Sequence, residues 1–384
     1  MKLIHTSDWH FGKSLAAGRD YEEDQRYFLD RLCELIRKEK VEAVLCSGDI
    51  YESARVKGEA VKLFSEAVKL FSEAATRLCK DLKVKLIVIA GNHDSASRLA
   101  SCSELLREVN MFVTGTIQRD PQPVLLDGGK VAVYSVPHFE RNEVINLFPE
   151  KEEEIRTSVD GARLYFDSIR QTMDPNRRNI ILSHSYVVGS EVSESEQTAR
   201  LGNSTALPVE IFDGFDYVAL GHIHKAQAIE DHIRYCGSPL PYAFGSEEKQ
   251  EKGVFLIDTD TMEKTFVPLP LLHGRKTLKG TYDEIIAQRE YRDYYLRIEV
   301  TDRYLGVSLQ AELGEHFNHI IECRGKNVGE KGESNALSLR DIETMKDEDI
   351  LCSFLREFHK YEPTEEEIQL FCDALDNDGE EEQK

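Results

Sequence analysis

Apolar runs alternate with amphipathic segments over the first 109 residues. The runs are short and rich in β-branched and aliphatic residues, which is typical of strands buried on both faces, and they cover residues 2–6, 41–46 and 85–89. Between them, residues 21–40 and 58–82 carry apolar side chains at helical spacing. Another helix is expected over residues 96–109. This alternation predicts an α/β fold with a parallel sheet and right-handed crossovers.

The helix predicted over residues 58–82 contains a direct repeat. Residues 59–65 and residues 66–72 both read Glu-Ala-Val-Lys-Leu-Phe-Ser. A seven-residue period places one apolar stripe along the helix, formed by Val61, Phe64, Val68 and Phe71. We expect this stripe to face a core, and a dimer contact is the alternative.

The pattern changes after residue 110. Short strands separated by turns predict a more antiparallel continuation, which ends at Pro268 and Pro270. We therefore expect a first domain over residues 1–270 and a small α+β domain over residues 271–345. Residues 346–384 predict two amphipathic helices and a charged tail.

Polar side chains follow five of the predicted strands, at the point where each strand ends. They are Asp8 and His10, Asp49, Asn92 with His93 and Asp94, His184, and His222 with His224. Any one group has an ordinary explanation, because Asn and Asp cap helices and single histidines are mostly structural. Open α/β sheets bind their ligands at the carboxyl ends of strands. Five such groups therefore favour one shared site.

The chemistry of these residues indicates metal binding. Aspartate, histidine and asparagine suit Mn, Fe or Zn, and the set contains no thiolate. The ligands are too many for one tetrahedral site, which points to two metal ions about 3.5–4 Å apart. The remaining histidines are interpreted as structural: His5, His138, His232, His273, His316, His319 and His359.

Composition limits the classes of function. The 384 residues allow two or more domains, and no apolar run approaches the roughly 20 residues of a membrane span. The polar N-terminal residues do not resemble a signal peptide, and eight cysteines without a CxxC pair are typical of free thiols, so we expect a cytoplasmic protein. The net charge of −22 argues against a large DNA-coating surface, although nine acids in residues 363–384 contribute much of it.

The order of the motifs resembles the calcineurin-like metallophosphoesterase family. The matching motifs are Asp8-x-His10, Gly48-Asp49, Gly91-Asn92-His93-Asp94, His184 and Gly221-His222-x-His224. Within this family the chain is similar to the SbcD-type nuclease subunits of bacterial SbcCD complexes, on residues 5–12, 48–51, 194–196, 201–202 and 237–239. Two departures are Glu52, where the family usually has Asp or His, and residues 54–57, where it has a Pro-rich turn.

The resemblance implies a role for each site residue. Asp8, His10 and His224 would bind a first metal ion, and Asn92, His184 and His222 a second, with Asp49 bridging the two. The ions, for which the resemblance favours Mn²⁺, would activate water for attack on phosphorus. His93 would stabilise charge on the phosphoryl oxygens and protonate the leaving oxygen, and Asp94 would orient its ring.

The resemblance also implies a DNA nuclease, with 3′–5′ exonuclease activity on double strands and endonuclease activity on single strands. Such a protein works with an SbcC-type coiled-coil ATPase on DNA ends and hairpins, in repair, recombination and replication. It would form a homodimer within a heterotetramer, and the helices of residues 346–384 would dock on the ATPase or, alternatively, pack on residues 271–345. Other hypotheses are a small-molecule phosphodiesterase, which suits the acidic charge better, and a scaffold without catalysis.

Overall fold

The structure is a computed structural model of the whole chain. It describes residues 1–15, 20–52, 60–193, 205–304 and 307–325, together with Thr364, Ile368 and Gln369. The chain divides into two compact units, Met1–Lys326 and Asn327–Lys384. Apart from those three positions, the predicted helices and acidic tail of residues 346–384 lie outside the described residues, as do residues 54–57, 194–196 and 201–202 of the family motifs.

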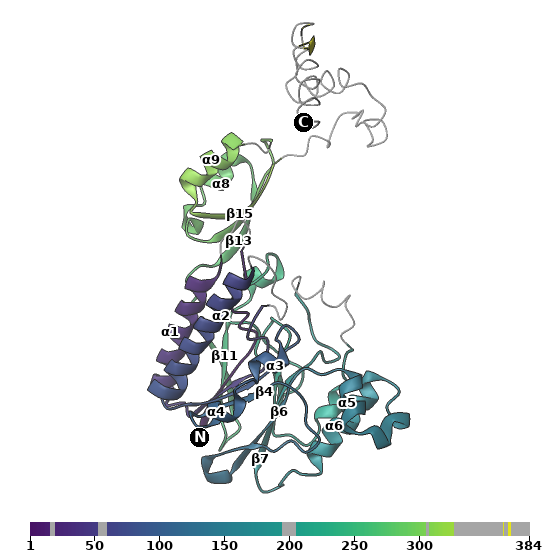
Figure 1. The fold of residues 1–384 in the computed structure, drawn as a ribbon. Coiled ribbons are helices and arrows are strands. Elements are labelled where there is room, and N and C mark those ends of the chain that lie inside the picture. Colours follow the sequence, from purple (N-terminus) through teal and green to yellow (C-terminus); the bar gives the residue numbers. More distant parts are fainter. Residues whose placement is uncertain are drawn as a thin grey trace, which may run out of the picture. The chain divides into compact units, whose positions relative to one another are not determined.

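The first sheet has six strands in the order β12-β11-β1-β2-β3-β4. The predicted parallel part is confirmed for β1 (Lys2–Thr6), β2 (Ala43–Cys46) and β3 (Lys85–Ile89). Strand β4 (Met111–Thr114), which was not predicted, adds a fourth parallel strand beside β3. Antiparallel strands β11 (Gly253–Asp258) and β12 (Lys264–Pro268) extend it beside β1. The helices α1 (Glu22–Glu39) and α2 (Ala60–Ala75) run side by side along this sheet (Figure 1).

The second sheet has the order β5-β6-β7-β8-β10-β9. Its strands are β5 (Val124–Leu126), β6 (Val131–Val136), β7 (Arg178–His184), β8 (Tyr217–Gly221), β9 (Gln227–Ala228) and β10 (Ile233–Tyr235). The expected antiparallel continuation is correct for β11 and β12 of the first sheet. In the second sheet it is correct only for the pairs β5–β6 and β9–β10, because β6, β7, β8 and β10 are parallel. The helices α5 (Arg141–Leu147) and α6 (Ser158–Arg170) lie beside this sheet (Figure 1).

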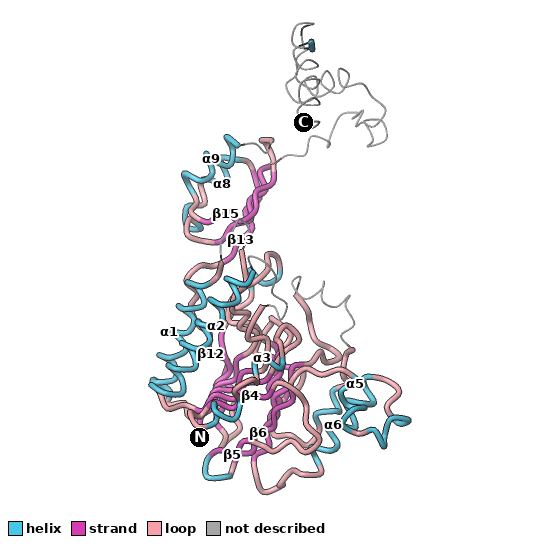
Figure 2. The backbone as a smooth tube through the Cα atoms, in the orientation of Figure 1, coloured by secondary structure: helices cyan, strands magenta, loops and turns pink. Residues whose placement is uncertain are grey.

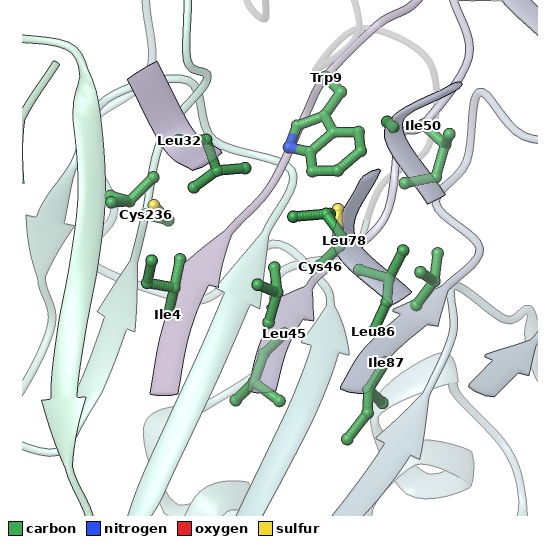
Figure 3. Packing of buried hydrophobic residues seen from close by; sticks show 14 of the residues in the cluster. Ile4, Trp9, Leu32, Leu45, Cys46, Ile50, Leu78, Leu86, Ile87 and Cys236 are labelled. Atoms are coloured by element: carbon green, nitrogen blue, oxygen red, sulfur yellow. The ribbon is translucent and has the colours of Figure 1, made fainter. Parts of the chain in front are cut away.

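The two sheets share a hydrophobic core, which makes the fold an α/β sandwich. Ile180 and Leu182 of β7 belong to the same buried cluster as Ile4 and Leu45 of the first sheet. Ile181, which points to the opposite face of β7, belongs to a second cluster that includes residues of α6. Figure 3 shows part of the first cluster, and Figure 2 shows the strands of both sheets in magenta.

The repeat in α2 does not produce the predicted stripe. Ala67, Leu70, Phe71 and Ala74 are buried, whereas Val68 is 36 % exposed. The buried positions keep helical spacing but begin at Ala67 instead of Val68, and neighbouring residues lie about 100° apart around a helix. The side chains of Val61 and Phe64 lie outside the described ones. The prediction of a core-facing helix is therefore confirmed, but the prediction for Val68 is wrong.

A third sheet follows the first two, with its own hydrophobic core. It consists of β13 (Arg275–Gly280), β14 (Tyr295–Val300) and β15 (His319–Arg324), with α8 (Tyr282–Ile286) and α9 (Val307–His316). This agrees with the predicted α+β character, although β13 was not expected, and the domain boundary at residue 270 stays a prediction. Asp24 of α1 binds the His273 backbone N–H at 3.1 Å, which joins the third sheet to the first domain.

The remaining elements are short. The helix expected over residues 96–109 is broken into α3 (Ala96–Leu99) and α4 (Ser103–Arg107). A π-helical turn, η2 (Thr76–Asp81), continues α2. The described residues also contain the 3₁₀ turns η3 (Asp127–Gly129), η4 (Pro149–Glu154), η5 (Val209–Phe212), η6 (Ser246–Lys249) and η7 (Arg289–Tyr291). Among the described helices, none has the length and apolar character needed to span a bilayer. The described cysteines are all free thiols.

Candidate metal centre

The predicted site residues come together where strands of both sheets end. Asp8 follows β1, Asp49 follows β2 and Asn92 follows β3, while His184 ends β7 and His222 follows β8. The packing of the second sheet against the first brings His184 and His222 close to the three loops of the first sheet. Of the predicted ligands, Asn92 is exposed and His222 half-buried, and the rest are buried: Asp8, His10, Asp49, His184 and His224.

The backbone at this site is unusual. Asp8, His10, Asp49 and His222 have φ values of 53°, 46°, 50° and 99°, a region that residues other than glycine seldom adopt. Such conformations persist where the surrounding structure holds them, and they gather at functional sites. Asp8 and His10 therefore do not extend strand β1 as expected. Their ligating atoms nevertheless lie within 4.8 Å of each other. Trp9 between them is fully buried in the core (Figure 3).

Three of the residues form a first cluster of metal-ligating atoms. Side-chain atoms of Asp8, His10 and His224 lie within 4.8 Å of one another. The Nε2 atoms of His10 and His224 are 3.1 Å apart, and Ser7 Oγ donates to Asp8 Oδ2 at 2.5 Å. This grouping is the one that the family resemblance implies for the first metal ion.

A second cluster gathers around the side-chain amide of Asn92. Its Oδ1 atom lies 3.0 Å from His184 Nε2 and 3.0 Å from His222 Nδ1. His184 Nδ1 is 2.8 Å from the carbonyl oxygen of Ser47, which accepts a hydrogen bond and leaves Nε2 as the atom directed at the site. These three residues are the set implied for the second metal ion.

Asp49 lies between the two clusters. Its Oδ2 atom is 3.4 Å from His184 Nε2 and 3.7 Å from His10 Nε2, while Oδ1 accepts the backbone N–H of His93 at 2.9 Å. A Cβ atom on Gly91 would lie 2.1 Å from Asp49 Oδ1, so only glycine leaves room for this carboxylate. The position fits a carboxylate that bridges two cations.

The electrostatics of the cluster favour an ionised Asp49. Burial raises the pKa of Asp49, but the charges of His184, His93 and His10 outweigh burial and hold the pKa well below its usual range. Burial lowers the pKa of His184, and the Asp49 charge then raises it to about 9. By contrast, burial lowers the pKa of His10 to about 4 and of His222 to about 3, which keeps both imidazoles in the neutral form that binds metals.

Asp94 does not make the contact that we expected with the His93 ring. Its Oδ1 and Oδ2 atoms instead accept the backbone N–H groups of Tyr51, Ile50 and Gly91, at 2.9, 3.1 and 2.9 Å. The His93 ring is held by the carbonyl oxygen of Glu52, 2.7 Å from its Nδ1 atom. The prediction that Asp94 orients His93 is therefore corrected: Asp94 fixes the loop that carries Asp49.

Glu52 belongs to the site, although sequence reasoning noted it only as a departure from the family. Its Oε2 atom lies 2.9 Å from His10 Nδ1, although the two are poorly aligned for a hydrogen bond, and Oε1 accepts from Lys13 Nζ at 2.7 Å. Burial raises the pKa of Glu52, but His10 and Lys13 outweigh burial and lower the pKa to about 2. The signal in the sequence that could have pointed to Glu52 is its place three residues after Asp49.

A cleft of about 800 Å³ opens beside the second cluster. Asn92, His184 and His222 form one part of its lining, and His138 lies next to them, its ring centroid 6.3 Å from that of His184. His138 was interpreted as structural, and nothing in its sequence surroundings indicated this position. The other lining residues include Phe139, Arg141, Asn142, Ser158, Tyr186 and Thr205.

Comparison with known proteins identifies the family. Residues 1–226 match the family described as calcineurin-like phosphoesterase. The chain belongs to the calcineurin-like phosphoesterase family. A curated relative, the SbcD subunit of the SbcCD nuclease of Staphylococcus epidermidis, is 30 % identical over 309 residues, which cover 79 % of each chain.

Solved structures have weaker similarity to this calcineurin-like phosphoesterase. An archaeal phosphodiesterase is 14 % identical with a TM-score of 0.31, over 70 % of this chain and 100 % of the other. A dimetal phosphatase from Danio rerio is 11 % identical with a TM-score of 0.38, over 67 % and 91 %. These scores are too low to bear on the site. Family membership makes the protein a phosphoesterase that uses divalent metal ions, and its clustered oxygen and imidazole donors fit such ions.

Proposed function

We propose that this phosphoesterase is a metal-dependent DNA nuclease, with 3′–5′ exonuclease activity on double strands and endonuclease activity on single strands. The observation that carries the proposal is the convergence of two donor clusters on Asp49, in a chain 30 % identical to a protein named as an SbcCD nuclease subunit. By this similarity it acts in the cytoplasm in DNA repair, recombination and replication.

Each donor cluster would hold one divalent cation. Asp8, His10 and His224 would hold the first, Asn92, His184 and His222 would hold the second, and Asp49 would serve both; Mn²⁺ is the ion we propose. Two such ions would supply a water of lowered pKa and positive charge against the phosphoryl oxygens. The protein contributes a fixed geometry, since four of these seven residues are held in left-handed backbone conformations.

His93 is the proposed acid and the group that stabilises charge on the substrate. Its Nδ1 atom faces the carbonyl oxygen of Glu52, a group that only accepts hydrogen bonds, so Nδ1 must carry the proton of that contact. Nε2 is then the atom that exchanges a proton with the leaving oxygen. Asp94 supports the reaction through the loop of Asp49, rather than through the His93 ring.

The cleft beside the second cluster is the proposed place for the nucleotide next to the cleaved bond. Its volume of about 800 Å³ accommodates a nucleotide, and Phe139 and Tyr186 offer rings on which a base can stack. The lining contains one basic and one acidic residue, Arg141 and Glu140, and Asn142, Ser158 and Thr205 add polar groups. This lining suits a nucleotide better than an entirely apolar ligand.

The proposed assembly follows the relative that is named as part of SbcCD. We propose that the protein works with an SbcC-type coiled-coil ATPase, as a homodimer within a heterotetramer. ATP-driven rearrangement of the partner would control access of DNA ends and hairpins to the cleft. Residues 346–384 are the proposed docking segment for the ATPase, and residues 271–345 are the proposed capping and DNA-binding domain.

The test is cleavage of labelled single-stranded and duplex DNA by the purified chain with Mn²⁺, beside a His93→Ala variant. His232→Ala serves as control, because this half-buried histidine lies outside the clusters. We expect Mn²⁺-dependent cleavage that His93→Ala loses and His232→Ala retains. Hydrolysis of bis-p-nitrophenyl phosphate without DNA cleavage, even with the ATPase added, would instead favour a small phosphodiester substrate, which the net charge of −22 also suits.

A further inference from the structure

A fully buried ion pair lies behind the first donor cluster. The side chains of Glu247, in turn η6, and Lys252 are 0 % and 1 % exposed, and Glu247 Oε2 lies 3.2 Å from Lys252 Nζ. Removing two charges from water costs more free energy than an average ion pair returns, so such pairs are weak evidence of a stabilising role. A fully buried ion pair therefore points to a functional role that requires its charges and that two apolar side chains would not fill.

Both partners contact His224. Glu247 Oε1 lies 3.5 Å from His224 Nδ1, which is close enough for electrostatic attraction but long for a strong hydrogen bond. Lys252 Nζ donates to the backbone carbonyl of His224 at 2.9 Å. The pair thus holds the residue at its ring and at its backbone. On the other side of the imidazole, Nε2 faces His10 Nε2 at 3.1 Å.

The pair is itself fixed by its surroundings. Glu247 Oε2 accepts the backbone N–H of Tyr242 at 2.9 Å, and Lys252 Nζ donates to Ser238 Oγ at 3.0 Å. Ser193 Oγ donates to Glu247 Oε1 at 3.2 Å. With this many partners the carboxylate has little freedom to turn away from His224.

We infer that Glu247, held in place by Lys252, is a positioning residue for the metal ligand His224. The carboxylate favours the proton on Nδ1, directs Nε2 into the first cluster, and increases the electron density of the ring. Carboxylates behind metal-binding histidines typically contribute 10- to 100-fold in metal affinity. The inference rests on the proposed metal centre, and it adds a determinant of affinity that does not touch the ion.

The adjacent residue offers a matched control. Glu248 shares turn η6 with Glu247, but its carboxylate faces the third sheet, where it accepts from Thr277 N at 2.9 Å and Thr277 Oγ1 at 2.5 Å. Glu248→Gln therefore makes the same chemical change one position away, without altering the surroundings of His224.

The experiment is titration of the metal-free full-length chain with Mn²⁺ by calorimetry. It compares the wild type with Glu247→Gln, Glu248→Gln and the double variant Glu247→Gln/Lys252→Met. The double variant guards against misfolding, because it leaves no unpaired buried charge. We expect two Mn²⁺ sites in the wild type and in Glu248→Gln. In the Glu247 variants, one site weakens 10- to 100-fold and the other is unchanged, and excess Mn²⁺ restores hydrolysis of bis-p-nitrophenyl phosphate.

The outcomes separate the inference from the proposed function. A folded Glu247 variant that binds two Mn²⁺ ions with wild-type affinity would overturn the inference alone. Loss of folding in both Glu247 variants, measured by circular dichroism, would also overturn it and assign the pair to stability. Absence of Mn²⁺ binding by the wild type would defeat the proposed metal centre, and the inference with it.

Discussion

Asp94 Oδ1 accepts the backbone N–H of Tyr51 at 2.9 Å, although 43 residues separate the two in the chain. The same carboxylate also binds the N–H groups of Ile50 and Gly91, so it joins the loop after β2 to the loop after β3. Asp49 stands at the start of the first of these loops. The position of the proposed bridging ligand, Asp49, therefore depends on Asp94. These three hydrogen bonds of Asp94 go to backbone groups and not to the side chain of any proposed metal ligand.

Replacement of Asp94 by alanine is expected to destabilise the whole protein. Three backbone N–H groups lose their acceptor, and each buried unsatisfied donor costs about 1–3 kcal/mol, partly relieved by water. We expect the free energy of unfolding of the metal-free chain to fall by about 2–4 kcal/mol, measured by urea denaturation, and kcat to fall as well. Asp120→Ala, at an exposed position, should change neither. Unchanged stability with reduced kcat would instead restore the role of orienting His93.

Removal of divalent ions is expected to lower the thermal stability of the wild type. Asp8, Asp49 and His184 place ligating atoms within 4.8 Å of one another, and a cation that binds there stabilises only the folded state. An ion at a hundred times its Kd adds about 2.7 kcal/mol to the free energy of unfolding. Chelation should therefore lower Tm by several degrees, and Mn²⁺ should restore it. Asn92→Ala should reduce the Mn²⁺-dependent rise and His232→Ala should not; a Tm independent of Mn²⁺ would contradict the metal centre.

The attachment of the third sheet is expected to weaken as the pH rises. His273 Nδ1 lies 3.2 Å from Asp24 Oδ2, and this contact raises the pKa of His273 above 6.5. A histidine whose pKa is raised on folding contributes stability that is complete below its unfolded pKa and is lost as pH rises through the folded pKa. The stability difference between wild type and His273→Gln should thus be largest below pH 6.5 and shrink above the folded pKa.

Thermal unfolding of both proteins without metal, from pH 5.5 to pH 9, measures this difference. His232→Gln provides the control, because this histidine lies between β9 and β10 of the second sheet and faces Glu230 instead of Asp24. A difference that grows as the pH rises would contradict the contribution of the Asp24–His273 pair.

Much of the site could be predicted from the sequence because residues of metal-ligating types follow the predicted strands directly. Asp8, Asp49 and Asn92 follow neighbouring parallel strands, whose carboxyl ends must meet at one edge of a sheet. His184 and His222 belong to the other sheet, and their approach depends on face-to-face packing of the sheets, which no local pattern encodes. The family resemblance supplied that information, and the structure gives its physical basis.

Each feature that the sequence did not predict has a physical cause. Strand β13 was not predicted because its sequence, Arg-Lys-Thr-Leu-Lys-Gly, contains no apolar run. It is an edge strand of a small sheet, and such a strand buries few side chains. The buried pair of Glu247 and Lys252 looks in the sequence like any exposed acidic and basic residues, since burial of charge depends on partners distant in the chain. Val68 lies on the predicted stripe but is 36 % exposed, because the buried face of α2 runs through Ala67, Leu70 and Ala74 instead.

Tyr186 is expected to distinguish long substrates from short ones. It lines the cleft beside the second cluster, with its ring centroid 6.4 Å from that of His222. Stacking of a base on an aromatic ring contributes about 1–3 kcal/mol, which corresponds to roughly 5- to 150-fold in affinity. Tyr186→Ala should therefore raise KM for an oligonucleotide several-fold, with little change in kcat.

The same variant should hydrolyse bis-p-nitrophenyl phosphate as the wild type does, because this substrate carries no base. Tyr27→Ala, on α1 and outside the cleft, should leave both substrates unaffected. Steady-state kinetics on the two substrates, with Mn²⁺ held constant, gives the comparison. An equal loss on both substrates would mean that Tyr186 supports the metal ligands rather than the nucleotide, and the cleft would no longer be assigned to substrate.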